Sequence, residues 1–416
     1  MTSGVHRQDA QAQEAGLPWR TAFLCLLVTM FEGFDLQILG VIAPMIRKDL
    51  SLSPQELGVV FGGATLGLLI GAIASGILAD AIGRKPTLVV AIGVFAIFTL
   101  ASSYAMSGDQ LALARFCTGI GLGGAMPSIA TLAGEATGRR SNVAFVTIMF
   151  AGMPLGGAVS ALAVALWPGD VSWRAVFLVG GVLQLVLTAL IWLWMPESQA
   201  FQSRARSGRE TKTGRVTLAA EAAHLSLAHW IGVAGLAIAF FFTLLSLHFF
   251  LNWLPTLLAE QGLTGRETAL VSSVFGLAGA IGSLVVAWLV QIGRFRLAMF
   301  GCYACVAAAS AMPWMFGGGL IGAFTISAVV GACLVGAQMT LYGMAPGVFP
   351  TSIRGGGVGA TIAMGRFGSF VGPTVAGALL GAGWSQNQVM AMNAPAAALA
   401  AISIAIALSL VRPIDT

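Results

Sequence analysis

Long apolar stretches alternate with short polar ones along most of the chain. A membrane-spanning helix needs about 20 apolar residues to cross a hydrocarbon core of about 30 Å. On this scale the pattern predicts twelve such helices, at about residues 20–46, 55–79, 87–106, 109–134, 142–167, 173–195, 229–254, 267–291, 297–316, 320–347, 356–381 and 387–411. We therefore expect an all-α membrane protein with twelve transmembrane helices.

The longest polar stretch, residues 196–228, divides the predicted helices into two groups of six. We expect a cytoplasmic tail at 1–19, a six-helix bundle at 20–195, a cytoplasmic linker at 196–228, a second six-helix bundle at 229–411 and a cytoplasmic tail at 412–416. This organisation is typical of transporters built from repeats, whose binding site lies between the halves near the middle of the membrane.

Composition supports a membrane protein and predicts its orientation. Charged residues make up only 9% of the chain, whereas they are about 25% of a soluble domain. The net charge of +5 does not indicate a nucleic-acid partner, because the basic residues lie in short loops between apolar stretches. With the N-terminus inside, fifteen of the 21 Lys and Arg residues fall on the cytoplasmic side and four outside. This asymmetry predicts cytoplasmic N and C termini.

Two acidic residues, Glu32 and Asp35, interrupt the first predicted helix. A charged residue at the centre of a membrane helix costs about 2.5–3.5 kcal/mol on insertion scales. Their spacing of three residues places both on one helix face, which should look into the protein or a water-filled cavity. Such residues indicate an ion or substrate path.

Two arginines also lie inside predicted helices, Arg115 in the fourth and Arg366 in the eleventh. At about 1.5 Å per residue, Asp35 lies about 22 Å from the inner start of its helix and Arg115 about 9 Å from the outer start of its own. In a core of about 30 Å these depths coincide, so we predict an Asp35–Arg115 pair. The alternative for Arg115 is a side chain extended to the outer headgroups.

By the same arithmetic Arg366 lies near the middle of the membrane. A guanidinium is always charged and needs an anionic partner at that depth. A substrate carboxylate, held through two parallel hydrogen bonds, is the natural candidate. A structural pair with an acid from the other half is the alternative.

The loop after the second predicted helix reads GILADAIGRKP (76–86). Asp80 ends the apolar helix, Gly83 suits a tight turn, and Arg84 can pair with acids or with helix C-termini. A degenerate copy, VQIGRFR (290–296), follows the eighth predicted helix, the equivalent place in the second half. An ordinary positively charged cytoplasmic loop is the alternative interpretation.

Five stretches together resemble the aromatic acid:proton symporters of the major facilitator superfamily, over about residues 20–411: EGFDLQILGVIAP, GILADAIGRKP, RFCTGIGLGGAMP, FFTLLSLHFFLNWLPTLLAEQG and FPTSIRGGGVGATIAMGRFG. The resemblance implies that Glu32 and Asp35 are the proton-coupling sites. It implies a conformational latch that includes Asp80, Gly83 and Arg84. It also links three charged positions to activity: Arg115, Glu135 and Arg366. Glu135 suits the latch, because it sits at the cytoplasmic end of the fourth helix; a solvated helix-end acid is the alternative.

The resemblance implies a symporter that imports an aromatic carboxylate, such as a hydroxyphenylpropionate or hydroxybenzoate, across the bacterial inner membrane by alternating access. Protons are the coupling ion and no other cofactor is expected. Glu32 stands where hydroxybenzoate members typically carry Asp, which favours the phenylpropionate side. The alternative is a symporter for another organic anion, or a drug or metabolite exporter. We expect a monomer.

Further polar residues lie in predicted helices that line the central cavity of this fold, and they are candidates to bind the substrate: Gln37, His248, Asn252, Gln338 and Tyr342. Packing between helices is the alternative for each. His248 is expected near the outer end of the seventh helix. Several aromatic side chains are candidates to stack on a substrate ring: Phe31, Phe34, Trp253, Tyr342 and Phe367.

Other classes of protein lack their signatures here. The four His residues show no metal-binding spacing, and neither a G-x-S-x-G nucleophile motif nor a phosphate-binding G-x-x-x-x-G-K-[ST] motif occurs. The five Cys residues lie in apolar stretches and are interpreted as packing residues. We therefore expect neither an enzyme, nor a metal site, nor direct use of ATP.

Overall fold

The computed structural model describes residues 19–167, 169, 171–198, 201, 226–311, 319–350 and 354–410, with the side chains of 19, 80, 130, 131, 133–150, 354 and 355 excepted. These residues contain no strand. The helices are α2 (Trp19–Asp49), α3 (Pro54–Ile82), α4 (Arg84–Ser103), α5 (Gly108–Ala165), α6 (Trp173–Trp194), α9 (Leu227–Glu260), α10 (Gly265–Gln291), α11 (Phe295–Ala311), α12 (Leu320–Met344), η1 (Ala345–Val348), α13 (Arg354–Gly381), α14 (Gln386–Ala391) and α15 (Asn393–Leu410).

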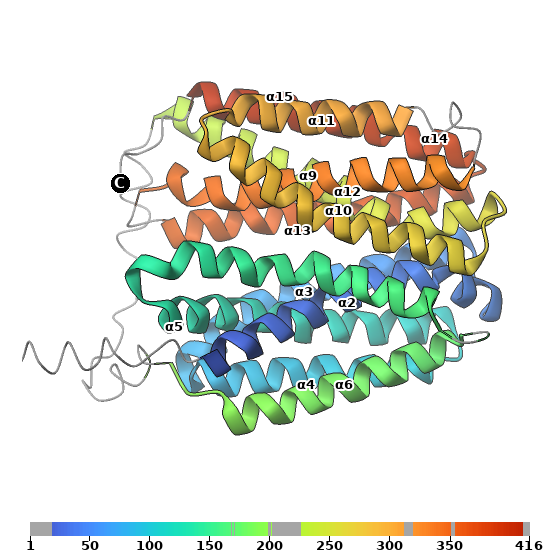
Figure 1. Cartoon of the computed structure of the whole chain (residues 1–416), viewed down its shortest axis with the longest axis horizontal. Helices are drawn as coiled ribbons and strands as arrows, with labels where there is room; N and C mark the ends of the chain where they lie inside the picture. Colours follow the sequence, from blue (N-terminus) through green and yellow to red (C-terminus); the bar gives the residue numbers. More distant parts are fainter. Residues whose placement is uncertain are drawn as a thin grey trace, which may run out of the picture.

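The predicted all-α membrane class is confirmed. Among the described residues, eight helices are long and apolar enough to cross a membrane, and two apolar stretches, Ala151–Ala165 and Phe295–Ala311, are shorter. Figure 1 shows the long helices lying side by side along one direction. The count of twelve spans and the cytoplasmic position of both termini stay predictions.

Local sequence sets where several helices begin. Ser53 and Thr264 precede α3 and α10, and each hydroxyl accepts a hydrogen bond from the backbone N–H three residues on. In turn, the carboxylates of Glu56 and Glu267 accept hydrogen bonds from the backbone N–H groups of Ser53 and Thr264. These reciprocal capping boxes satisfy donors that the first helical turn leaves unpaired.

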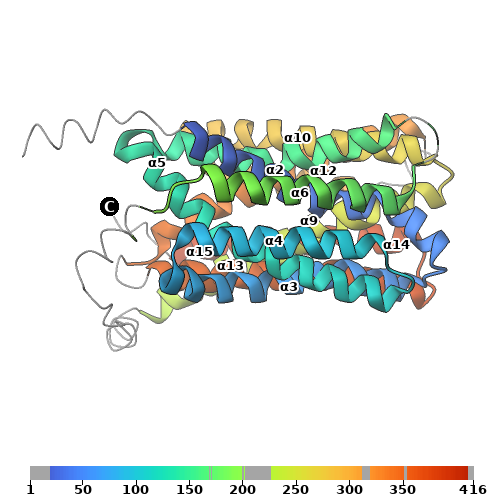
Figure 2. The same ribbon diagram turned by 90° about the horizontal axis from the view of Figure 1, so that it is seen from below.

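Helix α5 differs from the prediction of two helices at 109–134 and 142–167. Its helical backbone continues through the expected loop over 58 residues, a straight length of about 87 Å, almost three times the thickness of a bilayer core of about 30 Å. Figures 1 and 2 show that it turns back on itself instead. A side chain on Gly119 of the first arm would overlap Ala64 of α3, and one on Gly156 of the second arm would overlap Met30 of α2. The arms therefore pack on different helices.

The helices pack in two groups, α2–α6 and α9–α15, which Figure 1 separates by colour into blue-green and yellow-red halves. The groups meet where α3 lies against α13, α5 against α10 and α2 against α9. The two predicted bundles and their residue boundaries stay predictions. Most of the expected linker, residues 202–225, lies outside the described residues.

The two groups are joined closely at the end where α2 and α9 finish, which we call the Arg47–Glu260 end. Arg47 of α2 forms an ion pair with Glu260 of α9. Nearby, the indole Nε1 of Trp253 donates a hydrogen bond to the Pro373 carbonyl on α13 at 2.9 Å, and its ring packs edge-on against Phe61 of α3 at 5.4 Å. In the predicted orientation the Arg47–Glu260 end faces outward.

Candidate functional site

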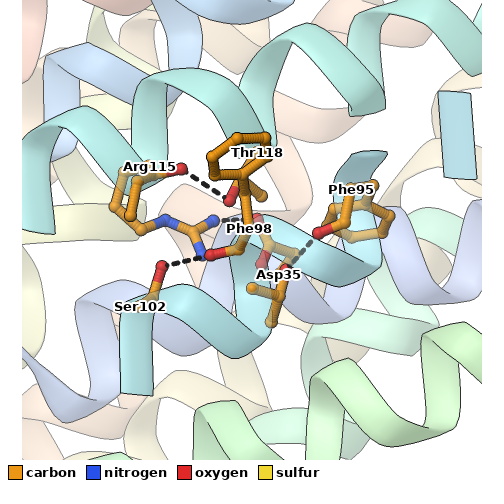
Figure 3. Close-up of polar contacts among 8 residues, drawn as sticks. Asp35, Phe95, Phe98, Ser102, Arg115 and Thr118 are labelled. Atoms are coloured by element: carbon orange, nitrogen blue, oxygen red, sulfur yellow. Dashed lines mark hydrogen bonds and ion pairs between the residues drawn. The ribbon is translucent and has the colours of Figure 1, made fainter. Parts of the chain in front are cut away.

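The predicted Asp35–Arg115 pair is present inside the N-terminal group of helices. Arg115, from the first arm of α5, donates to the Asp35 carboxylate on α2, and Figure 3 shows its side chain extending toward that carboxylate. Arg115 is fully buried and Asp35 is 2% exposed. The guanidinium also lies over the ring of Phe177 at 5.2 Å, a contact that favours a cation. The alternative of a side chain extended to the headgroups is therefore wrong.

Glu32 lies one turn away from Asp35 on α2 and has different surroundings. It is 1% exposed, and its Oε1 has no hydrogen-bond partner among the described residues. Arg366 of α13 lies within electrostatic range of Glu32. The two predicted acids therefore differ in their cationic partners. Asp35 forms an ion pair with Arg115 of its own half, while Glu32 interacts at longer range with Arg366 of the other half.

Arg366 is 9% exposed and forms no hydrogen bond or ion pair with any side chain that the structure describes. It lies within electrostatic range of His248 as well as Glu32. The structure thus brings together residues from α2, α9 and α13 that lie far apart in sequence. A buried guanidinium that pairs with no described carboxylate can bind the carboxylate of a substrate.

The expected position of His248 is wrong. Helix α9 continues to Glu260, so His248 lies twelve residues before its end, about 18 Å deep at 1.5 Å per residue. The side chain is 3% exposed, and its Nδ1 donates to the Leu244 carbonyl at 3.1 Å. Its Nε2 is buried without a partner among the described residues.

A cavity between the two halves contains about 410 Å³ of space not filled by atoms, including its open part. Residues from both halves line it: Gly33, Leu36, Gln37, Met153, Pro154, Leu247, Leu251, Phe275, Gly276, Val335, Gln338 and Met339. Two of these, Gly33 and Leu247, are the chain neighbours of Glu32 and His248.

The predicted polar candidates separate into two sets. Gln37 and Gln338 line the cavity. Asn252 donates to the carbonyl of His248 in its own helix at 2.8 Å, and Tyr342 packs against Phe240 with ring centroids 5.3 Å apart. Neither Asn252 nor Tyr342 is among the residues that line this cavity.

None of the aromatic residues singled out in the sequence lines this cavity; Phe275 does. Trp253 joins the two halves, as described above, and Phe367 is 45% exposed. The sequence carried one usable signal for Phe275. It lies on α10 between Ser272 and Gly276, and polar and small residues at this spacing mark a helix face that contacts other protein.

The predicted latch region is partly described. Gly83 has φ 103°, a conformation that glycine adopts at low cost. The backbone N–H groups of Arg84 and Lys85 donate to the Glu197 carboxylate at 2.9 and 3.1 Å. Glu197 follows α6 and was not predicted; a carboxylate at the N-terminus of α4 is favourable because unpaired N–H groups and the helix dipole meet there. The side chains of Asp80 and Glu135 lie outside the described residues.

Comparison with known proteins gives one consistent result. The family model of the Major Facilitator Superfamily matches residues 25–373. The chain is 35% identical over 393 residues to the 3-(3-hydroxy-phenyl)propionate transporter of Escherichia coli strain K12, covering 94% of each chain. It is 33% identical over 394 residues to the gallate transporter of Pseudomonas putida, covering 89% of this chain and 87% of the relative. A crystal structure of a D-xylose-proton symporter superposes with a TM-score of 0.75 at 15% identity, covering 96% and 99% of the two chains.

Proposed function

The chain belongs to the Major Facilitator Superfamily, and from this premise we propose that it imports an aromatic carboxylate together with protons. It is a multi-pass membrane transporter and not an enzyme. Relatives at 33% and 35% identity carry names of aromatic acid transporters and align over most of their length. Their substrates support a carboxylate on an aromatic ring as the substrate of this chain.

Arg366 is the observation that carries the proposal. Its guanidinium is almost fully buried between the halves and forms no ion pair with the side chains that the structure describes. Removing a charge from water costs several kcal/mol, about 20 kcal/mol as an idealised upper limit. A substrate carboxylate offsets this cost by forming two charge-assisted hydrogen bonds with the guanidinium. We place the ring in the cavity between the halves, which residues of both halves line.

Glu32 is the residue that we assign to proton coupling. Glu32 interacts electrostatically with Arg366. A substrate carboxylate bound to Arg366 therefore adds a second negative charge near the same guanidinium. Two carboxylates beside one guanidinium favour proton uptake by one of them. Asp35 is less suited to this step, because Arg115 already neutralises it. Its role is to hold α2 against α5, and thereby to position Glu32.

The transport cycle follows from these charges. A site with bound substrate and a protonated Glu32 carries less uncompensated charge than the empty site, so closing it to water costs less. The two groups of helices then rock about the site, as in other transporters built from repeats. The contacts at the Arg47–Glu260 end break when the site opens on that side.

Uptake into proteoliposomes tests the proposal. Purified protein is reconstituted, a proton gradient is imposed, and labelled benzoates, hydroxybenzoates and phenylpropionates are offered as a panel. Accumulation that collapses with an uncoupler is expected for at least one aromatic acid. Accumulation of a different organic anion alone, or export alone, would contradict the proposal and support the alternative given above.

Three variants separate the roles. Arg366→Gln should abolish both accumulation and substrate exchange, because it removes the counter-ion. Glu32→Gln should abolish proton-driven accumulation but keep exchange of substrate across the membrane. Glu56→Gln, at an exposed helix cap, is the matched acid control and should transport normally. Normal accumulation by Glu32→Gln would refute its role in coupling.

A further inference from the structure

We propose that Gln338 and Phe275 recognise the substrate ring, and that Gln338 selects aromatic acids that carry a ring hydroxyl group. This inference rests on the proposed function, since it assigns the ring-binding part of the same site. It adds a substrate class to the counter-ion and proton roles given above.

The chemistry of the cavity points to Gln338. Of the residues that line it, only Gln37 and Gln338 have polar side chains. The Gln37 amide donates to the Ser272 carbonyl on α10, in the other half, and its Oε1 lies where a side chain on Gly157 would be. Gln37 is therefore held in place by existing contacts. It joins the two halves and has little freedom to bind a ligand.

Gln338 differs from Gln37 in having no partner. It is 4% exposed, and no hydrogen bond links it to any residue within the described ranges. Its amide can both donate and accept, and so can a phenolic hydroxyl group. One ring hydroxyl can therefore satisfy Gln338, whereas an unsubstituted ring would leave a buried amide unpaired. Sites built in this way reject the analogue that lacks the hydroxyl group.

The position of Gln338 fits a substrate whose carboxylate is on Arg366. Gln338 lies 18 residues after the start of α12 and Arg366 lies 15 residues before the end of α13. At about 1.5 Å per residue these distances are about 27 and 22 Å. The two helix ends lie on the same side of the bundle in Figure 1. A carboxylate on Arg366 and a ring hydroxyl group on Gln338 would therefore lie at similar depths, with the ring between α13 and α12.

Phe275 supplies the apolar part of the recognition. It is the one aromatic side chain among the residues that line the cavity, on α10, and it is 3% exposed. Met153 and Met339 line the same cavity from α5 and α12. Aromatic rings pack favourably against another ring and against thioether sulfur. These contacts do not depend on a hydroxyl group, so they set affinity for any ring, while Gln338 sets selectivity.

Competition in proteoliposomes measures the selectivity. Uptake of a labelled hydroxylated acid is inhibited by matched pairs, 3-(3-hydroxyphenyl)propionate against 3-phenylpropionate and 4-hydroxybenzoate against benzoate. The intact protein should bind the hydroxylated member of at least one pair tenfold or more tightly. Gln338→Met, which keeps the length and volume of the side chain, should weaken that member about tenfold and bring the ratio near one.

Gln184→Met is the matched control. Gln184 is a buried amide on α6, outside this cavity, and neither of its polar atoms has a partner among the described residues. Its replacement should leave the ratio unchanged. Phe275→Leu should weaken both members of each pair by a similar factor of about 3–10 and keep the ratio.

The outcomes separate this inference from the proposed function. If the intact protein transports aromatic acids but binds both members of every pair equally, the inference fails and the proposed function stands. A Gln338→Met protein that keeps the ratio also overturns the inference. If the intact protein transports no aromatic acid, the proposed function fails. The ratio for the intact protein needs no variant, so misfolding of Gln338→Met leaves the test decisive.

Discussion

Removing one member of the Asp35–Arg115 pair should strongly destabilise the protein. Both side chains are buried, and two unit charges about 4 Å apart attract by about 4 kcal/mol at an effective dielectric constant of 20. Breaking a buried ion pair typically costs about 3–5 kcal/mol, because the remaining charge is left without compensation. At about 2 °C per kcal/mol or more, each single variant should lower the thermal midpoint by on the order of 6 °C.

The two single variants should differ in their response to pH. In Arg115→Met, Asp35 can take up a proton and become neutral, so stability should recover as the pH falls. In Asp35→Asn, Arg115 keeps its charge at every accessible pH, so acid should give no recovery. The contact with Phe177 offsets only part of that cost, since a cation–π contact contributes about 2 kcal/mol when desolvated.

Thermal midpoints of detergent-purified protein, measured by size-exclusion chromatography after heating, provide the assay. The double variant Asp35→Asn with Arg115→Met should be more stable than either single variant, because it leaves no unpaired charge. Arg174→Gln is the control: it breaks the exposed ion pair with Asp49 and should cost less than about 1 kcal/mol. Single variants that shift the thermal midpoint by less than 2 °C would refute the reasoning. So would a double variant whose loss in thermal midpoint equals the sum of the two single losses.

Three further predictions concern the latch, the contact between α5 and α2, and the Arg47–Glu260 end. Glu197→Ala should lower the thermal midpoint through a loss of about 1–2 kcal/mol at the N-terminus of α4, and Glu197→Gln should lose less; equal losses would contradict the cap. Gly156→Ala should destabilise the protein by about 1–3 kcal/mol, because the new methyl group overlaps α2. In the control Gly301→Ala nothing lies within 4 Å of the new methyl group, so its thermal midpoint should stay the same or rise. Arg47→Gln should cost less than about 1 kcal/mol of stability, because its pair with Glu260 is about one-third exposed. It should nevertheless speed hydrogen exchange at the ends of α2 and α9. Unchanged exchange would argue against a gate at the Arg47–Glu260 end.

The Asp35–Arg115 pair could be predicted from sequence because its geometry depends on two constants. Helical rise is fixed at about 1.5 Å per residue, and the bilayer core is about 30 Å thick. Two buried charges in different helices can then be placed at the same depth without knowing the fold. Opposite charges at the same depth have a strong reason to meet, since an unpaired charge there is costly.

The course of α5 could not be predicted in the same way. The polar stretch around Glu135 was expected to be a loop because it interrupts two apolar runs. Glu, Ala and Arg are nevertheless good helix formers, so a polar interruption between two apolar runs does not have to end a helix. The position of His248 was wrong for a related reason, since α9 continues past the predicted end to Glu260.

The sequence also did not show which residues of α10 line the cavity. Helix α10 is apolar on the side that faces lipid as well as on the side that faces protein: Ile281 is 63% exposed, while Phe275 is 3% exposed. In a soluble protein the polar face of a helix reveals which side is buried, but a helix that is apolar all round gives no such contrast. Apart from its position between Ser272 and Gly276, nothing in the pattern separated Phe275 from the phenylalanines that were proposed to stack on the ring.

The two acids of α2 illustrate what packing adds to a sequence motif. Three residues apart, Glu32 and Asp35 carry the same chemistry and imply the same role. Tertiary structure separates them, because Arg115 neutralises Asp35 within one half, while Glu32 has only the distant field of Arg366 from the other half. A charge that is already paired has no reason to change with the transport cycle. A charge whose compensation belongs to the opposite half must change whenever substrate binds or the halves move apart, and this dependence is what coupling of protons to substrate requires.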